Sequence, residues 1–246
     1  SARSLRPHIL DLSRDDADLQ AGAIAALTQT LTPMLGLINH GCEAKCKELS
    51  DAMRRRIAAD GGLNGVQQQA CDLDGDCAIA ADSLRACLRD VSLRALRIVL
   101  KNPDVETSLA SNGLDVEGRL CLRAYPAVAN ADSRSVRLGA HCDSTLLTLL
   151  WSDGPGLQVL DPETAADWPP ESILRYGLPT MGDLDNPAEL HEDQWATVDL
   201  PWLQNPILLT LGTSWLTSEV TTACPAQCAV LHRVLMPRDR TRHSLP

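Results

Sequence analysis

The chain has 246 residues, of which 44% are hydrophobic and 22% charged, and its formal net charge is −10 at pH 7. This length suits one domain with a sizeable core. The acidic excess argues against a nucleic-acid partner, because phosphate binding needs clustered Lys and Arg. No apolar run reaches the roughly 18 residues of a membrane-spanning helix. We therefore expect a cytoplasmic, monomeric protein whose partner is a small molecule, with no nucleic acid or membrane involved.

Nine cysteines are scattered along the chain. An odd number, spread through presumed helices and strands, indicates reduced thiols rather than a disulfide framework. The closer pairs lack the Cys-x-x-Cys spacing typical of zinc sites, so we expect them to be small buried apolar residues. These pairs are Cys42 with Cys46, Cys71 with Cys77, and Cys224 with Cys228.

The region from about residue 15 to residue 100 has helical periodicity. One apolar stripe consists of Ile24, Leu27 and Leu31, and a second of Leu84, Leu88, Val91, Ala95 and Ile98. Asp82 or Ser83 can cap the second helix, and the sequence Asn-Pro at 102–103 ends it. Between the two stripes, glycines within 61–65 and glutamines at 67–69 predict a loop.

From residue 118 onward the pattern changes to short apolar segments separated by turn residues. The expected strands cover 119–125, 137–151, 156–160, 195–199, 206–212, 228–236 and 240–245. Strands this short and this numerous predict a double-sheet jelly roll with helices packed outside it.

His141 and Asp143 stand two residues apart in one of these expected strands. Side chains at i and i+2 of a strand project from the same face, so the two can bind one metal ion. His232 lies in a later apolar run that also reads as a strand, and it is the candidate for a third ligand. Two histidines and one carboxylate on one face of an octahedron leave open positions and favour non-haem Fe(II). The spacing therefore predicts an iron site.

Arg242 and Ser244 repeat the two-residue spacing shortly after the distal histidine. A guanidinium and a hydroxyl on one face of a strand form a fork that can bind a carboxylate. His243 lies between them, so it is expected to point to the opposite face and not to bind the metal. His40 belongs to an Asn-His-Gly segment, which indicates structural turn chemistry.

With these residues in place, the chain resembles the isopenicillin N synthase-like family of Fe(II)/2-oxoglutarate-dependent oxygenases. The matching segments follow the order of the family. They are PHILDLS at 7–13, LGLINHG at 35–41, LRAYP at 122–126, HCD at 141–143, LLTLL at 146–150, GLQV at 156–159, HRV at 232–234 and RHS at 242–244. Each match is weak alone, whereas the ordered set is specific.

The resemblance implies a mainly β fold with flanking helices. Its core is a double-stranded β-helix, or jelly roll, at 111–246, preceded by an α-rich region at 1–110. It implies that Fe(II) is bound by His141, Asp143 and His232, with O2 as the oxidant.

The resemblance also implies 2-oxoglutarate as a cosubstrate whose far carboxylate binds Arg242 and Ser244. Tyr125 is a candidate neighbour of this cosubstrate, as in relatives, and packing within the barrel is an equally good interpretation of it. The implied reaction oxidises a small organic substrate, most often by hydroxylation, and releases succinate and CO2.

Three features depart from the family's pattern. The family places its two metal histidines closer together than positions 141 and 232, and the excess falls in an insertion at 161–193. We expect this insertion to be a lid or wall of the substrate pocket, with a tolerated surface loop as the alternative. The family's Gly-Asp before the distal histidine reads Gly-Thr at 212–213, and relatives continue beyond the equivalent of residue 246. Such a tail would be expected to complete the substrate pocket.

Three other functions compete with this interpretation. A cosubstrate-free oxidase of the isopenicillin N synthase kind would use the same iron ligands. A zinc hydrolase could activate water on His141, Asp143 and His232, but Arg242 and Ser244 would then have no purpose. A non-catalytic jelly roll acting as a binding module is the third alternative.

Overall fold

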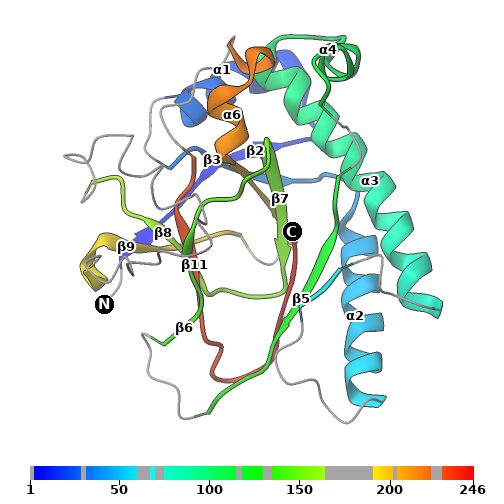
Figure 1. Cartoon of the computed structure of the whole chain (residues 1–246), viewed down its shortest axis with the longest axis vertical. Coiled ribbons are helices and arrows are strands. Elements are labelled where there is room, and N and C mark those ends of the chain that lie inside the picture. The colour runs from blue at the N-terminus through cyan, green and yellow to red at the C-terminus, as the bar shows by residue number, and fades with distance from the viewer. Residues whose placement is uncertain are drawn as a thin grey trace.

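The computed structural model of the chain describes residues 3–28, 32–59, 67–69, 75–114, 118–129, 135–163, 191–201, 204–222 and 229–246. Two β-sheets face each other, and helices cover the outer face of one of them (Figure 1). The mainly β jelly roll with flanking helices that the sequence predicts is confirmed.

The larger sheet contains, in spatial order, β2 (His8–Asp11), β3 (Met34–Ile38), β10 (Ile207–Leu211), β7 (Leu147–Ser152), β12 (Arg242–Leu245), β5 (Cys121–Tyr125) and β4 (Gln67–Gln69). The smaller sheet contains β1 (Arg3–Leu5), β9 (Trp195–Val198), β8 (Leu157–Leu160), β11 (His232–Leu235) and β6 (Val136–His141). The helices are α1 (Asp16–Thr28), α2 (Glu43–Ala59), α3 (Gly75–Leu100), α4 (Val105–Ser111) and α6 (Thr213–Thr217), with 3-10 turns η2 (Glu192–Gln194) and η4 (Glu219–Thr221).

Strand β7 shows how alternation assigns the two faces of the larger sheet. Leu149 and Trp151 pack against the helices, whereas Thr148 and Leu150 line the space between the sheets. Period-two alternation produces this division because successive side chains in a strand point to opposite faces. One apolar core therefore lies under the helices, and a second, which includes Leu157 and Val234, lies between the two sheets.

The helices pack along the outer side of the larger sheet, where α2 and α3 run beside β5 and β7 (Figure 1). The predicted stripe on α3 is confirmed: Leu84, Val91, Ala95 and Ile98 are buried in the core under the helices. The helix ends at Leu100, as Asn-Pro at 102–103 predicts. Its predicted start is wrong, because α3 already begins at Gly75.

Two predicted boundaries in the strands are also wrong. The single strand expected over 137–151 is split into β6 and β7, which belong to different sheets. The chain has to turn between them, so residues 142–146 lie outside both strands. The glutamines expected in a loop form β4, which pairs antiparallel with β5. Tertiary pairing at a sheet edge outweighs their low strand propensity.

The expectation of reduced thiols is wrong for one pair of cysteines. Cys42, at the start of α2, and Cys87, in α3, form a disulfide with Cα atoms 6.0 Å apart. They are separated by 45 residues in the chain, so spacing alone gives no sign of the bond. Packing of α2 against α3 brings them together. Among the described residues, Cys46, Cys77 and Cys121 are free, and the first two are buried as expected.

Most of the insertion at 161–193, namely 164–190, lies outside the described residues. Its two ends are held together, because Leu160 pairs with Trp195 across β8 and β9 and the Asp161 amide donates to the Gln194 carbonyl at 2.8 Å. The insertion therefore connects two adjacent strands of a hairpin. Within the part of the chain that the structure describes, no helix combines the length and apolar character needed to cross a membrane.

Candidate active site

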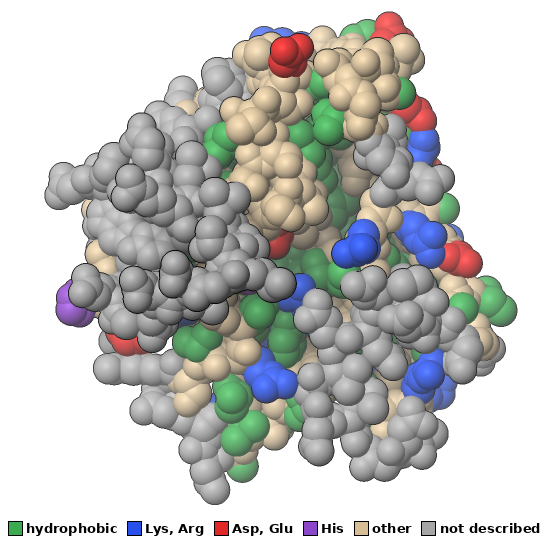
Figure 2. Space-filling view, viewed as in Figure 1, with side chains coloured by type: hydrophobic (Ala, Val, Ile, Leu, Met, Phe, Trp, Pro, Cys, Tyr) green, Lys and Arg blue, Asp and Glu red, His purple; other side chains and the backbone are tan. Residues whose placement is uncertain are grey.

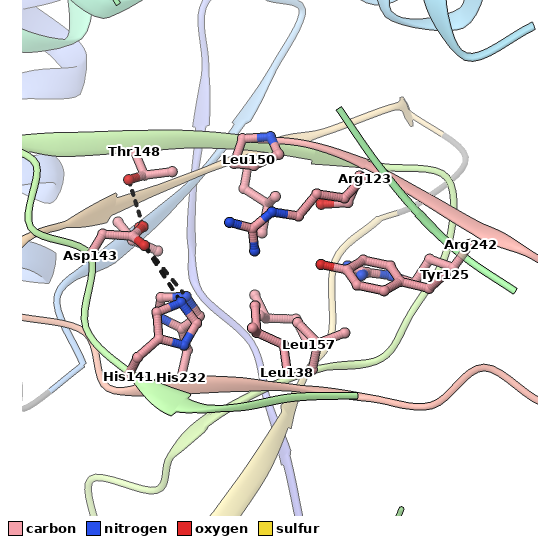
Figure 3. Close-up of a pocket in the computed structure, with 14 residues that line it drawn as sticks. Arg123, Tyr125, Leu138, His141, Asp143, Thr148, Leu150, Leu157, His232 and Arg242 are labelled. Carbon is pink, nitrogen blue, oxygen red and sulfur yellow. Dashed lines mark hydrogen bonds and ion pairs between the residues drawn. The ribbon is translucent and has the colours of Figure 1, made fainter. Parts of the chain in front are cut away.

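Three side chains from the predicted metal pattern meet between the sheets. His141 ends β6 and His232 begins β11, and the two residues are paired across these neighbouring antiparallel strands. Their Nε2 atoms lie 3.7 Å and 3.9 Å from Oδ1 of Asp143. One ligand atom from each residue lies within 4.8 Å of the others (Figure 3). This group could hold a metal ion.

Hydrogen bonds orient both imidazole rings. Nδ1 of His141 lies 2.8 Å from the Gly139 carbonyl, and Nδ1 of His232 lies 3.0 Å from the Val230 carbonyl. A carbonyl only accepts, so each Nδ1 donates to it, and each Nε2 is directed towards Asp143. Burial lowers the pKa of His141 to about 4, with His232 the next cause, so this imidazole is neutral near pH 7. A neutral ring is the form that binds a metal.

Asp143 is held by a loop rather than by the strand on which it was predicted. It lies two residues beyond the end of β6, and its Oδ2 accepts a hydrogen bond of 2.6 Å from the Thr148 hydroxyl. Its backbone carbonyl accepts a hydrogen bond of 2.8 Å from the amide of Thr213. The carboxylate thus keeps Oδ1 directed towards the two histidines.

The Gly-Thr segment at 212–213 supports this loop through its backbone. A Cβ atom at position 212 would overlap the Thr145 carbonyl oxygen and lie 2.8 Å from that of Asp143, so only glycine fits without movement. The contact from Thr213 is made by its amide, which any residue except proline supplies. Threonine in place of the family's aspartate therefore leaves the support of Asp143 intact.

A second group of polar residues lies on the larger sheet, facing the same pocket. Arg242 pairs with Tyr125 across β12 and β5, and Ser244 pairs with Arg123. All four line the pocket that contains the metal candidates. The Arg242 guanidinium lies over the Tyr125 ring, 5.6 Å from its centroid. The two-residue spacing on each strand thus places four polar side chains on one face.

Arg242 is buried and only partly hydrogen-bonded. The residue is 3% exposed, Nε donates to the Gly154 carbonyl at 3.1 Å, and Nη1 has no hydrogen-bond partner among the described residues. Burial lowers the pKa of this guanidinium, although Tyr125 and Asp153 oppose the effect. A buried cation with an unused donor is costly unless an anion joins it. The geometry therefore suits a carboxylate-containing ligand.

His40 and His243 have hydrogen-bond partners away from the metal candidates. Nε2 of His40 lies 2.9 Å from the Asn205 carbonyl, and Nδ1 accepts from the Cys42 amide at 3.1 Å. His243 points to the face opposite Arg242, where its Nδ1 contacts Asp153. Neither residue lines the pocket.

Sequence reasoning missed two residues of the site. Thr148 gives no signal by itself, because its role depends on the turn that brings it back to Asp143. Arg123 does give a signal, since it stands two residues before Tyr125 and so shares its face. Apolar side chains, among them Leu138, Leu150 and Leu157, complete the walls (Figure 3). The face seen in Figure 2 is hollowed near its centre, with apolar side chains inside and basic ones at the edge.

No protein-family model matches the chain, and no curated protein matches it either. Solved structures do. A putative oxygenase from Shewanella oneidensis superposes with a TM-score of 0.63 at 12% identity, over 98% of this chain and 89% of that one. JOX2 in complex with 2OG, Fe and JA gives 0.59 at 16%, over 99% of this chain and 74% of that one. The dioxygenase for auxin oxidation (DAO) in rice gives 0.54 at 17%, over 97% and 81%.

At these identities the likeness shows the fold. The resemblance read from the sequence motifs and the likeness between structures point to the same group of proteins, whereas membership of the isopenicillin N synthase-like subgroup stays a prediction. The chain has the jelly-roll fold of iron- and 2-oxoglutarate-dependent oxygenases.

Proposed function

We propose that the protein is an Fe(II)- and 2-oxoglutarate-dependent oxygenase that oxidises a small organic substrate. One observation carries the proposal: the cluster of His141, Asp143 and His232 shares a pocket with Arg242, a buried cation that has an unused donor. A metal site alone fits many reactions. A metal site next to a carboxylate anchor fits a reaction that needs a metal-bound organic acid.

The residues present fit both groups. Two neutral imidazoles and one carboxylate would bind Fe(II) and leave positions open for other ligands. Arg242, Ser244 and Tyr125 form the second subsite, where the far carboxylate of 2-oxoglutarate would accept from Nη1 of Arg242 and from the Ser244 hydroxyl. A solved structure with a similar fold, JOX2, is in complex with 2OG, Fe and JA, which supports the proposal.

Iron with 2-oxoglutarate and O2 would supply the oxidant for a C–H bond and would release succinate and CO2. The chain's own residues position these groups. Thr148 orients the Asp143 carboxylate, and the backbone carbonyls of Gly139 and Val230 fix the two imidazole tautomers. The leucines of the walls make the surroundings of the metal candidates apolar. Hydroxylation is the outcome we propose for the substrate.

Succinate formation tests the proposal directly. The protein is loaded with Fe(II) under anaerobic conditions, given 2-oxoglutarate and then exposed to air, and succinate is measured. We expect slow turnover in wild type and in His191→Ala, which changes an exposed histidine outside the pocket. We expect none in Asp143→Ala or His232→Ala, and metal analysis should show that these two variants have lost tight Fe(II) binding.

The other outcomes separate the competing functions. Oxygen consumption that does not depend on 2-oxoglutarate would indicate a cosubstrate-free oxidase. Hydrolytic activity with zinc and none with iron would indicate a hydrolase. Metal and 2-oxoglutarate binding without any turnover would leave a binding module. Retention of stoichiometric metal in His232→Ala would show that the distal ligand is wrongly assigned.

A further inference from the structure

Arg123 is a second cation in the pocket, and the proposed binding of metal and cosubstrate gives it no role. It lies in the middle of β5 and pairs with Ser244 of β12. Its guanidinium extends into the space between Asp143 and Tyr125, with Leu150 beside it (Figure 3). The guanidinium therefore lies inside the cavity and extends from its strand towards the metal candidates.

Within the described part of the chain, Arg123 has no anionic partner. Its Nε is buried without a hydrogen bond, and its side chain forms no described ion pair. The single acidic residue among those lining the pocket is Asp143, whose oxygens face Thr148 and the two histidines. An unpaired guanidinium in an apolar cavity is unfavourable. A ligand that brings an anion to Arg123 would therefore gain binding free energy.

The charges of the described lining residues indicate what kind of ligand suits Arg123. Among the described residues, those that line the pocket contribute two arginines and one aspartate, which is one more positive than negative charge. Fe(II) adds two positive charges and 2-oxoglutarate adds two negative ones, so together they leave the net charge of the pocket unchanged. Both carboxylates of the cosubstrate are then matched, one by the metal and one by Arg242. The remaining positive charge is that of Arg123.

The two arginines also differ in depth. Arg242 is 3% exposed and is tied to the Gly154 carbonyl, as expected for the anchor of a cosubstrate that binds deep in the pocket. Arg123 is half-buried, and the leucines at 138, 150 and 157 surround the space around it. This combination of one free cation and apolar walls matches a molecule with one carboxylate on an apolar body.

We propose that Arg123 binds the carboxylate of the substrate, and that the substrate is a small monocarboxylic acid with an apolar body. The inference rests on the proposed function, since it assigns Arg242 to 2-oxoglutarate. It makes Arg123 the residue that selects acids over neutral molecules of the same shape. A neutral analogue would leave the guanidinium buried without an anionic partner, so its binding would be weaker than that of the acid.

Matched acid and amide probes test the inference by binding, without turnover. Protein loaded with Mn(II) and saturated with 2-oxoglutarate under anaerobic conditions is titrated calorimetrically with phenylacetate, cyclohexylacetate and hexanoate, and with the three corresponding primary amides. We expect at least one acid to bind about tenfold or more tightly than its amide, because a charge-assisted hydrogen bond has roughly that effect on affinity. In Arg123→Gln the preference should fall to near one, and Arg123→Lys should restore part of it.

Arg119→Gln is the matched control, because Arg119 precedes the same strand and is exposed outside the pocket. It should keep the acid preference of wild type.

Equal binding of acids and amides, no binding of any acid, or an unchanged preference in Arg123→Gln would each overturn the inference. So would a larger loss of affinity for 2-oxoglutarate than for the acid in Arg123→Gln, which would assign Arg123 to the cosubstrate. If wild type binds no 2-oxoglutarate, the proposed function fails, and an acid preference measured with Mn(II) alone would still report on Arg123.

Discussion

His243 donates a hydrogen bond of 2.8 Å from Nδ1 to Oδ2 of Asp153, on the face of β12 opposite Arg242. The His243 amide donates to the other carboxylate oxygen at 2.8 Å, and Arg54 of α2 donates to Oδ2 at 2.7 Å. The next residue after Asp153, Gly154, offers the carbonyl that holds Nε of Arg242. The buried carboxylate therefore connects a helix, the turn after β7 and the strand that carries the proposed cosubstrate anchor.

Replacing Asp153 by Asn should destabilise the fold and flatten its response to acid. Burial alone would raise the pKa of Asp153, but hydrogen bonds from His243 and Arg54 outweigh it and lower the pKa to about 2. A carboxylate whose pKa is lower in the folded state stabilises the fold above its unfolded pKa of 3.8. This contribution is lost as the pH falls from that value towards 2. We expect the melting temperature of wild type to drop more steeply across this range than that of Asp153→Asn.

The exposed Asp239 provides the control, since Asp239→Asn should retain the wild-type pH response. At pH 7, Asp153→Asn should lower the free energy of unfolding by about 2 kcal/mol, because Arg54 keeps only its exposed pair with Asp51 and His243 faces a weaker acceptor. Parallel melting curves for wild type and Asp153→Asn between pH 4 and pH 2 would contradict the assignment.

Gly212→Ala should weaken metal binding from outside the metal site. The new Cβ would meet the backbone carbonyls of Thr145 and Asp143, so the loop that carries Asp143 has to move. We expect a loss of about 1–3 kcal/mol in stability and a clear fall in Mn(II) affinity measured by calorimetry. Gly118→Ala is the matched control, because a Cβ at position 118, before β5 and outside the pocket, would meet nothing within 4 Å. Equal metal affinity in the two variants would show that the backbone at 212 does not position Asp143.

The disulfide between Cys42 and Cys87 should contribute measurably to stability. A bond that closes a loop of 45 residues restricts the unfolded chain, and we expect Cys87→Ser to lower the free energy of unfolding by about 2–4 kcal/mol. Cys121→Ser, which removes a free thiol, should change it much less. Alkylation of the unfolded, unreduced protein followed by mass spectrometry checks the bond itself. Labelling of all nine cysteines would show that the bond is absent.

The sequence indicates which residues share a pocket better than it indicates where the surrounding elements begin and end. Two-residue spacing and motif order select His141, Asp143, His232, Arg242 and Ser244, and the structure places all five in one pocket, whereas their functional roles stay predictions. Strand alternation accounts for Arg242 and Ser244, which lie two residues apart in β12 and share one face. The reason given for Asp143 was wrong, since it lies in the loop after β6 and is positioned by Thr148 and Gly212.

Contacts between segments far apart in the chain could not be predicted in this way. Cys42 and Cys87 meet because α2 packs on α3, and Asp153 meets Arg54 across 99 residues. Neither pair has a local pattern. The role of Arg123 depends on a charge balance that needs the whole lining of the pocket, although its period-two relation to Tyr125 was visible in the sequence.

Arg242→Gln should weaken the binding of 2-oxoglutarate but leave unaffected the binding of an analogue that lacks the far carboxylate. The far carboxylate of 2-oxoglutarate would lose a charge-assisted hydrogen bond, which corresponds to a loss of about ten- to a hundredfold in affinity. 2-Oxopentanoate has the same chain length and keeps the keto acid that would bind the metal, but a methyl group replaces the far carboxylate. Calorimetry on the Mn(II)-loaded protein should therefore show that Arg242→Gln binds the two compounds with similar affinity, whereas wild type strongly prefers 2-oxoglutarate.

Arg242→Lys should not restore the preference, because lysine lacks the planar fork that reaches Gly154 and the ligand together. The exposed Arg238 is the control, and Arg238→Gln should behave as wild type. An equal loss for both compounds in Arg242→Gln would mean that Arg242 supports the fold of the pocket and does not bind the cosubstrate.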